Sequence, residues 1–225
     1  VKILSDGTAS VIAGGQDIGT GTRTILWQVA AEELGFEPTN VSLLIGDTDT
    51  CPYGTISGGS RTIGTMAPAV RMAAADAKRQ LLLHAAKQMN LPADRLSIRE
   101  GHVFDTLNPA VRKPIGEVAS AIATKDSNEL VDNPDHMIIG RGSRGPNPPG
   151  KAVLTWCAHF AEVEVDTATG KIRILRYVAA HDSGRVINPH TYTNQVEGGV
   201  IQGIGFALFE AVSYTHLRAH ETVLD

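Results

Sequence analysis

The sequence is poor in cysteine and contains neither a basic run nor a long apolar run. Its two cysteines, Cys51 and Cys157, stand far apart, so neither a disulfide framework nor a CxxC zinc site is indicated. The formal net charge of -4, without clustered lysine or arginine, argues against a nucleic-acid backbone as partner. No segment is apolar for long enough to span a bilayer, and no signal peptide is recognisable. A content of 42% hydrophobic and 20% charged residues is typical of a soluble globular protein.

The apolar periodicity predicts hairpins that alternate with helices. Asp6-Gly7 and Glu100-Gly101 are expected to be hairpin turns, and Gly35 is expected to end a helix. The expected strands are 1–4, 8–12, 41–45, 96–98, 102–104, 153–166 and 171–180. The expected helices are 24–34, 61–90 (broken early by Pro68), 114–123 and 188–210. The fold class is therefore α+β, with antiparallel hairpins and helices packed on them.

The stretch "AGGQDIGTGTRT", residues 13–24, places a glycine-rich loop between an expected strand and an expected helix. In such an arrangement free amides at the start of the helix can face an anion. Gly15, Gly19 and Gly21 would let the backbone approach a bulky ligand closely, and Thr20 adds a neutral hydrogen-bonding group. A tight turn with a purely structural role explains this segment equally well.

A second loop, "TISGGSRTIG", repeats this chemistry. Gly58 and Gly59 are followed by Ser60, Arg61 and Thr62 as a helix begins. Two such loops in one chain favour a phosphorylated or polyanionic cofactor. Arg61 suits anion contact, although a solvent-exposed arginine at a helix start is the alternative.

The segment "NQVEGGVIQGIG" places glycines inside an expected helix. Gly199, Gly203 and Gly205 each cost roughly 1 kcal/mol relative to alanine, so close packing or close approach of a ligand must offset them. Gln195 and Gln202, about two helical turns apart, could present their amides on one face. The alternative is a packed helix whose glutamines only cap neighbouring groups.

Two generic motif matches do not lead to a function. Gly140, Gly142 and Gly145 fit G-x-G-x-x-G, but the prolines that follow forbid the helix that a dinucleotide site needs. Ser60 lies in a partial match to the nucleophile elbow G-x-S-x-G, whose last glycine is missing. A serine hydrolase remains an alternative, which a fluorophosphonate label on Ser60 would reveal.

Taken together, "GGQDIGTGTRT", "SGGSRT" and "DSGRVINP…NQVEGGVIQGIGFALFE" resemble the molybdenum-cofactor-binding large subunit of the xanthine dehydrogenase and aldehyde oxidoreductase family, in its bacterial three-subunit aldehyde oxidoreductase form. The match runs from residue 1 to about 210 in the expected order. It implies a molybdopterin cofactor with molybdenum, in the cytosine dinucleotide form, and hydroxylation of aldehydes or N-heterocycles with oxygen from water. Iron–sulfur ([2Fe-2S]) and FAD cofactors would belong to partner subunits, because this chain has no cysteine cluster.

The resemblance also assigns roles to individual residues. The backbone of Gly59 would lie beside the metal, and Gln195 would hydrogen-bond the pterin. Thr20 is a departure, because several relatives carry glutamine there, and this weakens its assignment. The expected cofactor-binding residues are Gly15, Ile18, Gly19, Thr20, Gly21, Gly58, Gly59, Ser60, Arg61, Thr62 and Gln195.

The general base of the family is a glutamate in a G-E-P-P-like segment, which this sequence does not contain, so no catalytic residue is assigned. We expect an internal piece of a longer subunit, inactive alone, that begins upstream of Val1. Residues 1–135 and 136–211 would form two parts of the molybdopterin-binding region. Residues 212–225, with His216 and His220, resemble a translated sequencing adapter. The cytoplasm is the default compartment, and the periplasm is the alternative. A non-catalytic module that binds a phosphorylated ligand remains the rival hypothesis.

Overall fold

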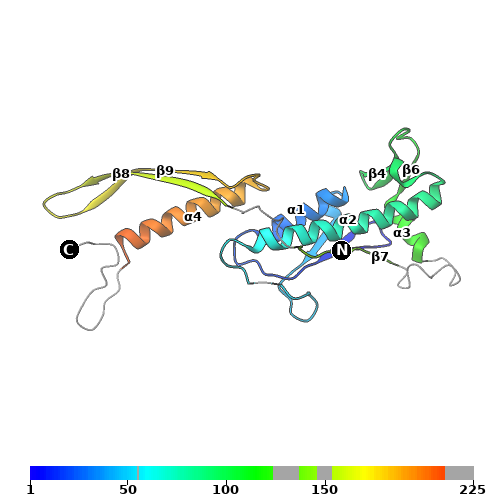
Figure 1. Cartoon of the computed structure of the whole chain (residues 1–225), viewed down its shortest axis with the longest axis horizontal. Coiled ribbons are helices and arrows are strands. Elements are labelled where there is room, and N and C mark those ends of the chain that lie inside the picture. The colour runs from blue at the N-terminus through cyan, green and yellow to red at the C-terminus, as the bar shows by residue number, and fades with distance from the viewer. Residues whose placement is uncertain (55, 124–136, 146–153, 211–225) are drawn as a thin grey trace. The chain divides into compact units, whose positions relative to one another are not determined.

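The structure is a computed structural model that describes residues 1–54, 56–123, 137–145 and 154–210. The chain forms two compact units, Val1–Asn147 and Pro148–Asp225 (Figure 1). The expected tail over 212–225 lies outside the described residues. Among the described helices, none is both long and apolar enough to cross a membrane.

The first unit is built on a four-stranded sheet with the order β3-β2-β1-β7. The hairpin of β1 (Lys2–Ile3) and β2 (Ala9–Ile12) closes through Gly7, whose φ of 86° favours glycine. β7 (Ile138–Ile139) pairs with the other edge of β1. β3 (Val41–Leu44) pairs with β2 in parallel, a pairing that the sequence analysis did not anticipate.

Two helices cover this sheet. α1 (Thr22–Leu34) ends at Gly35 in the left-handed conformation, as predicted, and the 3-10 turn η1 (Pro38–Asn40) leads into β3. α2 (Thr62–Met89) packs along α1 (Figure 1). The predicted break at Pro68 is wrong, because the helix continues through it. Proline removes one hydrogen bond there, and the alanine-rich residues that follow have high helix propensity and continue the helix.

A second, smaller sheet follows α2. The 3-10 turn η2 (Ala93–Arg95) precedes β4 (Leu96–Arg99), which pairs with β5 (His102–Asp105), and β5 pairs with β6 (Arg112–Pro114). The turn at Glu100 and Gly101 has positive φ at both residues, as a tight hairpin requires. α3 (Ile115–Ala123) completes the unit.

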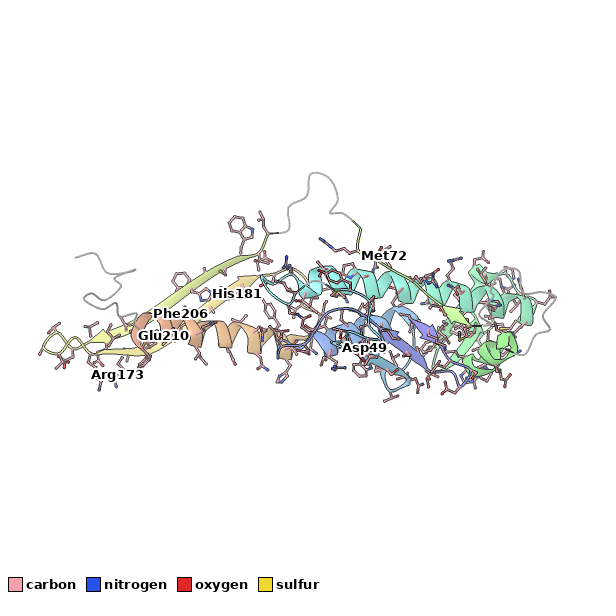
Figure 2. All side chains as sticks on the ribbon, turned by 90° about the horizontal axis from the view of Figure 1, so that it is seen from below. Asp49, Met72, Arg173, His181, Phe206 and Glu210 are labelled. Atoms are coloured by element: carbon pink, nitrogen blue, oxygen red, sulfur yellow. The ribbon has the colours of Figure 1, made fainter. Side chains whose placement is uncertain are left out.

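The second unit is a hairpin and one helix. β8 (Trp156–Val165) and β9 (Ile172–Asp182) pair antiparallel, and α4 (Pro189–Leu208) begins at Asn188, whose side chain accepts a hydrogen bond from the amide of Thr191. Ion pairs between Arg173 and Glu164 and between Arg176 and Glu162 help to fix the register. Figure 2 shows Arg173 near the tip of this hairpin.

The two units differ in burial. Among the described residues, every buried apolar residue lies in the first unit, where α1 and α2 pack on the sheet around Leu26, Leu34, Ala74 and Leu81. In the second unit none of the described residues is buried. The predicted α+β class, with antiparallel hairpins and packed helices, is confirmed.

Candidate functional site

The first glycine-rich loop connects β2 to α1. Gly15, Gly19 and Gly21 have φ values of 100°, 97° and 80°, which side chains rarely tolerate. These glycines are therefore needed for the loop conformation itself. Ile18, between them, is 65% exposed and presents an apolar side chain at the surface.

Asp17 holds this loop together. Its carboxylate accepts hydrogen bonds from the amides of Gly19 (3.0 Å), Gly21 (3.2 Å) and Arg23 (3.0 Å). Slight burial alone would raise the pKa of Asp17, but these amides favour the charged form and the pKa is lowered. The expectation that the amides at the start of α1 are open to an anion is therefore wrong for these three amides, because the chain supplies its own carboxylate there.

The second loop leads into α2. Gly59 and Ser60 both have left-handed backbones, with φ of 62° and 55°. This conformation is uncommon for serine and costs free energy, which makes Ser60 a strained residue beside a candidate site. Arg61 is exposed, whereas Thr62 is buried at the start of the helix.

The two loops lie against each other. The hydroxyl of Ser57 donates a hydrogen bond to the carbonyl of Gln16 at 2.8 Å. A Cβ added at Gly14 would lie 2.4 Å from the carbonyl oxygen of Pro52 and 2.8 Å from the amide of Gly54. Only glycine permits this approach of the two backbones, so the fold itself brings the loops together.

A cavity of ≈ 470 Å³ opens beside the contact between the loops. Its wall includes Gly14 and Gly54 from the loops, Thr65 and Met66 from α2, and Arg144 from the segment that follows β7. The side chain of Met66 also lies near Gly15, because a Cβ added at Gly15 would be 3.7 Å from Cγ of Met66. Apolar walls with a few polar groups at the rim are typical of small-molecule sites.

The third candidate region lies on α4, in the second unit. Gln195, Gly198, Gly199 and Gln202 share one side of the helix, since successive residues turn by about 100°. The residues of α4 that line a groove against β9 are Tyr192, Thr193, Val196, Glu197, Val200 and Ile201. The glutamines and glycines therefore point away from the hairpin.

The glycines of this face are not explained by packing. A Cβ at Gly198, Gly199 or Gly203 would meet no atom within 4 Å among the described residues, and none of the three has a positive φ. Their cost in helix stability is thus not offset within the described part of the chain. Gly205 differs, because a Cβ added there would lie 3.6 Å from a carboxylate oxygen of Glu210.

The structure joins the first two predicted loops in one unit and places Gln195 in the other. It adds Asp17, Gly54, Ser57 and Met66 as residues that shape the site. Only Asp17 could have been found from the sequence, as an acid placed before a helix start, where its side chain can cap the amides. The roles of the other three depend on contacts between distant segments.

Comparison with known proteins identifies the family of the chain. The sequence profile of the molybdopterin cofactor-binding domain family matches residues 1–222. The xanthine dehydrogenase molybdenum-binding subunit of Escherichia coli O157:H7 is 32% identical over 211 residues, which cover 91% of this chain and 26% of that protein. The aldehyde oxidoreductase molybdenum-binding subunit PaoC of E. coli K12 is 29% identical, covering 95% and 26%.

Solved structures give the same result. The crystal structure of quinoline 2-oxidoreductase from Pseudomonas putida 86 superposes with a TM-score of 0.78 at 28% identity, over 95% of this chain and 27% of that one. The chain spans about a fifth to a quarter of the length of the curated relatives that it matches. The resemblance seen in the three glycine-rich motifs is confirmed, and the chain belongs to the molybdopterin cofactor-binding domain family.

Proposed function

We propose that the two glycine-rich loops and one face of α4 bind a molybdopterin cofactor, as part of a molybdenum hydroxylase. This glycine face of α4 consists of Gln195, Gly198, Gly199 and Gln202. The observation that carries this is the exposed backbone at Gly198 and Gly199, which neither a positive φ nor packing against any described residue explains. Beside it, Gln195 and Gln202 offer amides that can donate to and accept from a heterocycle edge. The family match supports a pterin as the ligand.

The residues of the first unit fit such a group. At Gly19 and Gly59 an added Cβ would meet nothing within 4 Å among the described residues, and this open backbone leaves room for a polar ring system with a phosphate tail. Thr20 and Ser60 add hydroxyls at the same loops, and exposed Arg61 adds a positive charge. When bound, the molybdenum cofactor supplies the oxidation of a carbon centre with oxygen from water.

The parent activity that we propose is hydroxylation of an aldehyde or an N-heterocycle. Relatives named for xanthine, aldehydes, nicotine and quinoline support this range. We further propose the cytosine dinucleotide form of the cofactor, with [2Fe-2S] and FAD carried by partner subunits. In this scheme the chain binds and orients the cofactor, and the general base lies in a segment outside it.

The test uses the parent large subunit co-expressed with its partners. Gly199→Leu places a bulky side chain on the glycine face of α4, and Glu197→Leu places the same side chain on the face toward β9. Molybdenum is measured by elemental analysis and pterin by the fluorescence of its oxidised form. We expect Gly199→Leu to lose most of both and Glu197→Leu to retain them.

Equal cofactor content in the two variants would contradict the role of the glycine face. A wild-type parent that is active without molybdenum would refute the whole assignment. A parent that holds a different phosphorylated ligand and no metal would favour the non-catalytic binding module instead.

A further inference from the structure

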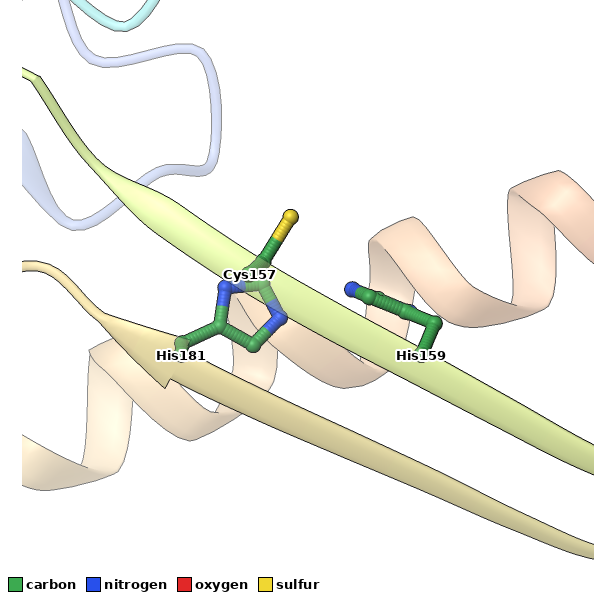
Figure 3. Close-up of side chains that lie close together, drawn as sticks. All are labelled: Cys157, His159 and His181. Carbon is green, nitrogen blue, oxygen red and sulfur yellow. The ribbon is translucent and has the colours of Figure 1, made fainter.

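A cysteine and two histidines meet on the hairpin of the second unit. The thiol of Cys157 and one ring nitrogen each of His159 and His181 lie within 4.8 Å of one another (Figure 3). These are the three side chains among the described residues that could together hold a metal ion. None of the three is among the predicted cofactor-binding residues, and all three belong to a single unit.

The β-ladder sets this arrangement. Cys157 is paired directly with His181, and His159 follows two residues after Cys157 on the same strand. Paired residues and residues two apart share one face of a hairpin, so all three side chains project on the same side. The rigid backbone pairing therefore preorganises the three donors.

The two rings are already oriented toward each other. The centroids of His159 and His181 are 4.9 Å apart with an interplanar angle of 75°. Nδ1 of His159 lies 3.1 Å from the hydroxyl of Tyr177, which leaves its Nε2 available on the other side of the ring. A histidine ligand commonly makes such a hydrogen bond through its second nitrogen, which fixes the tautomer and the ring orientation.

We propose that Cys157, His159 and His181 form a site for a zinc-like divalent ion. One thiolate and two imidazoles match the preference of zinc, and three protein ligands leave a fourth tetrahedral position open. Tetrahedral bonds of about 2.0–2.3 Å would separate the donor atoms by roughly 3.3–3.6 Å. Small side-chain rotations would bring the donors to these separations, and all three side chains are exposed and have room to make them.

Cobalt(II) is the probe, added to the purified and reduced 225-residue chain. We expect one equivalent to bind, with a thiolate-to-cobalt charge-transfer band that zinc abolishes by displacement. Cys157→Ser and His181→Gln should lose the band, whereas the matched changes Cys51→Ser and His190→Gln should keep it. Tyr177→Phe should weaken binding about 10-fold, as loss of a ligand-orienting hydrogen bond does.

A second measurement needs no variant. Zinc should slow alkylation of Cys157 and leave Cys51 unchanged, as measured by mass spectrometry of the labelled peptides. The proposal is overturned if zinc protects neither thiol or both equally. It is also overturned if the cobalt band survives Cys157→Ser, or if it disappears in a His216→Gln/His220→Gln double variant. Neither measurement involves the pterin, so the outcome is independent of the proposed cofactor function.

Discussion

Gly140→Ala is expected to destabilise the first unit strongly. A Cβ at this position would lie 2.0 Å from the carbonyl oxygen of Ala73 and 2.4 Å from the amide of Ala77, both in α2. An ordinary contact begins near 3.4 Å, so the segment after β7 would have to retreat by about 1.4 Å from a rigid helix backbone.

That retreat has a second cost. Gly140 and Val1 exchange two hydrogen bonds, of 2.8 and 2.9 Å, which continue the pairing of β1 with β7. Overpacking costs about 1–3 kcal/mol. Two weakened hydrogen bonds add about 0.5–1.5 kcal/mol each. The expected loss in the free energy of unfolding is thus about 2–6 kcal/mol, a large part of the stability of a small domain.

Urea unfolding of the 225-residue chain, followed by far-UV circular dichroism, measures this loss. Gly145→Ala is the matched control, because an added Cβ there meets no described residue within 4 Å and the φ of Gly145 is not positive. It should change stability by less than about 0.5 kcal/mol. If Gly140→Ala unfolds at the wild-type urea concentration, or if Gly145→Ala loses as much, the close approach to α2 is not what requires glycine.

Three further outcomes are expected. Asp17→Asn should lower stability by about 0.5–1 kcal/mol at neutral pH. Because the pKa of Asp17 is lowered on folding, its contribution is present above the unfolded pKa and is lost as pH falls through the folded value, so wild type and variant should converge in acid-unfolding curves. Ser60→Gly should raise the free energy of unfolding by about 0.5–1 kcal/mol by relieving a left-handed serine, whereas Ser97→Gly, in strand β4, should lower it in the same urea-unfolding assay. Residues 148–225 expressed alone should show no cooperative melt, since a hairpin and a helix without buried residues are marginal; a sharp transition with near-UV dichroism would contradict this.

Local signals in the sequence predicted the local structure well. Gly7, Gly35 and Gly101 have the positive φ that their turn and helix-end assignments require. The parallel pairing of β2 with β3 was missed, because it depends on how α1 packs back onto the sheet. β7 was missed because two residues are too short to show any periodicity.

The same holds for the candidate site, where local composition was recognised and contacts between distant segments were not. The glycine-rich loops were recognised from their composition, but their contact through Ser57 and Gln16 joins residues 41 positions apart. The glycines at 140 and 142 were rejected as a nucleotide motif, and the structure gives them a different role as close contacts to α2. Asp17 corrects one prediction, because its carboxylate accepts hydrogen bonds from three amides of the loop and helix start that were expected to be open to an anion.

The hairpin of β8 and β9 also has a consequence for how the protein behaves in concentrated solution. In the described residues it forms a two-stranded sheet, so each strand keeps one lateral edge with unpaired amides and carbonyls. Its outer half carries alternating charges, Glu162 and Glu164 opposite Arg176 and Arg173, whereas its base carries Trp156 and Phe160. Edge-to-edge pairing of one copy with another is therefore opposed near the tip by the cost of removing water from these charged side chains, whereas the exposed aromatic side chains at the base favour it.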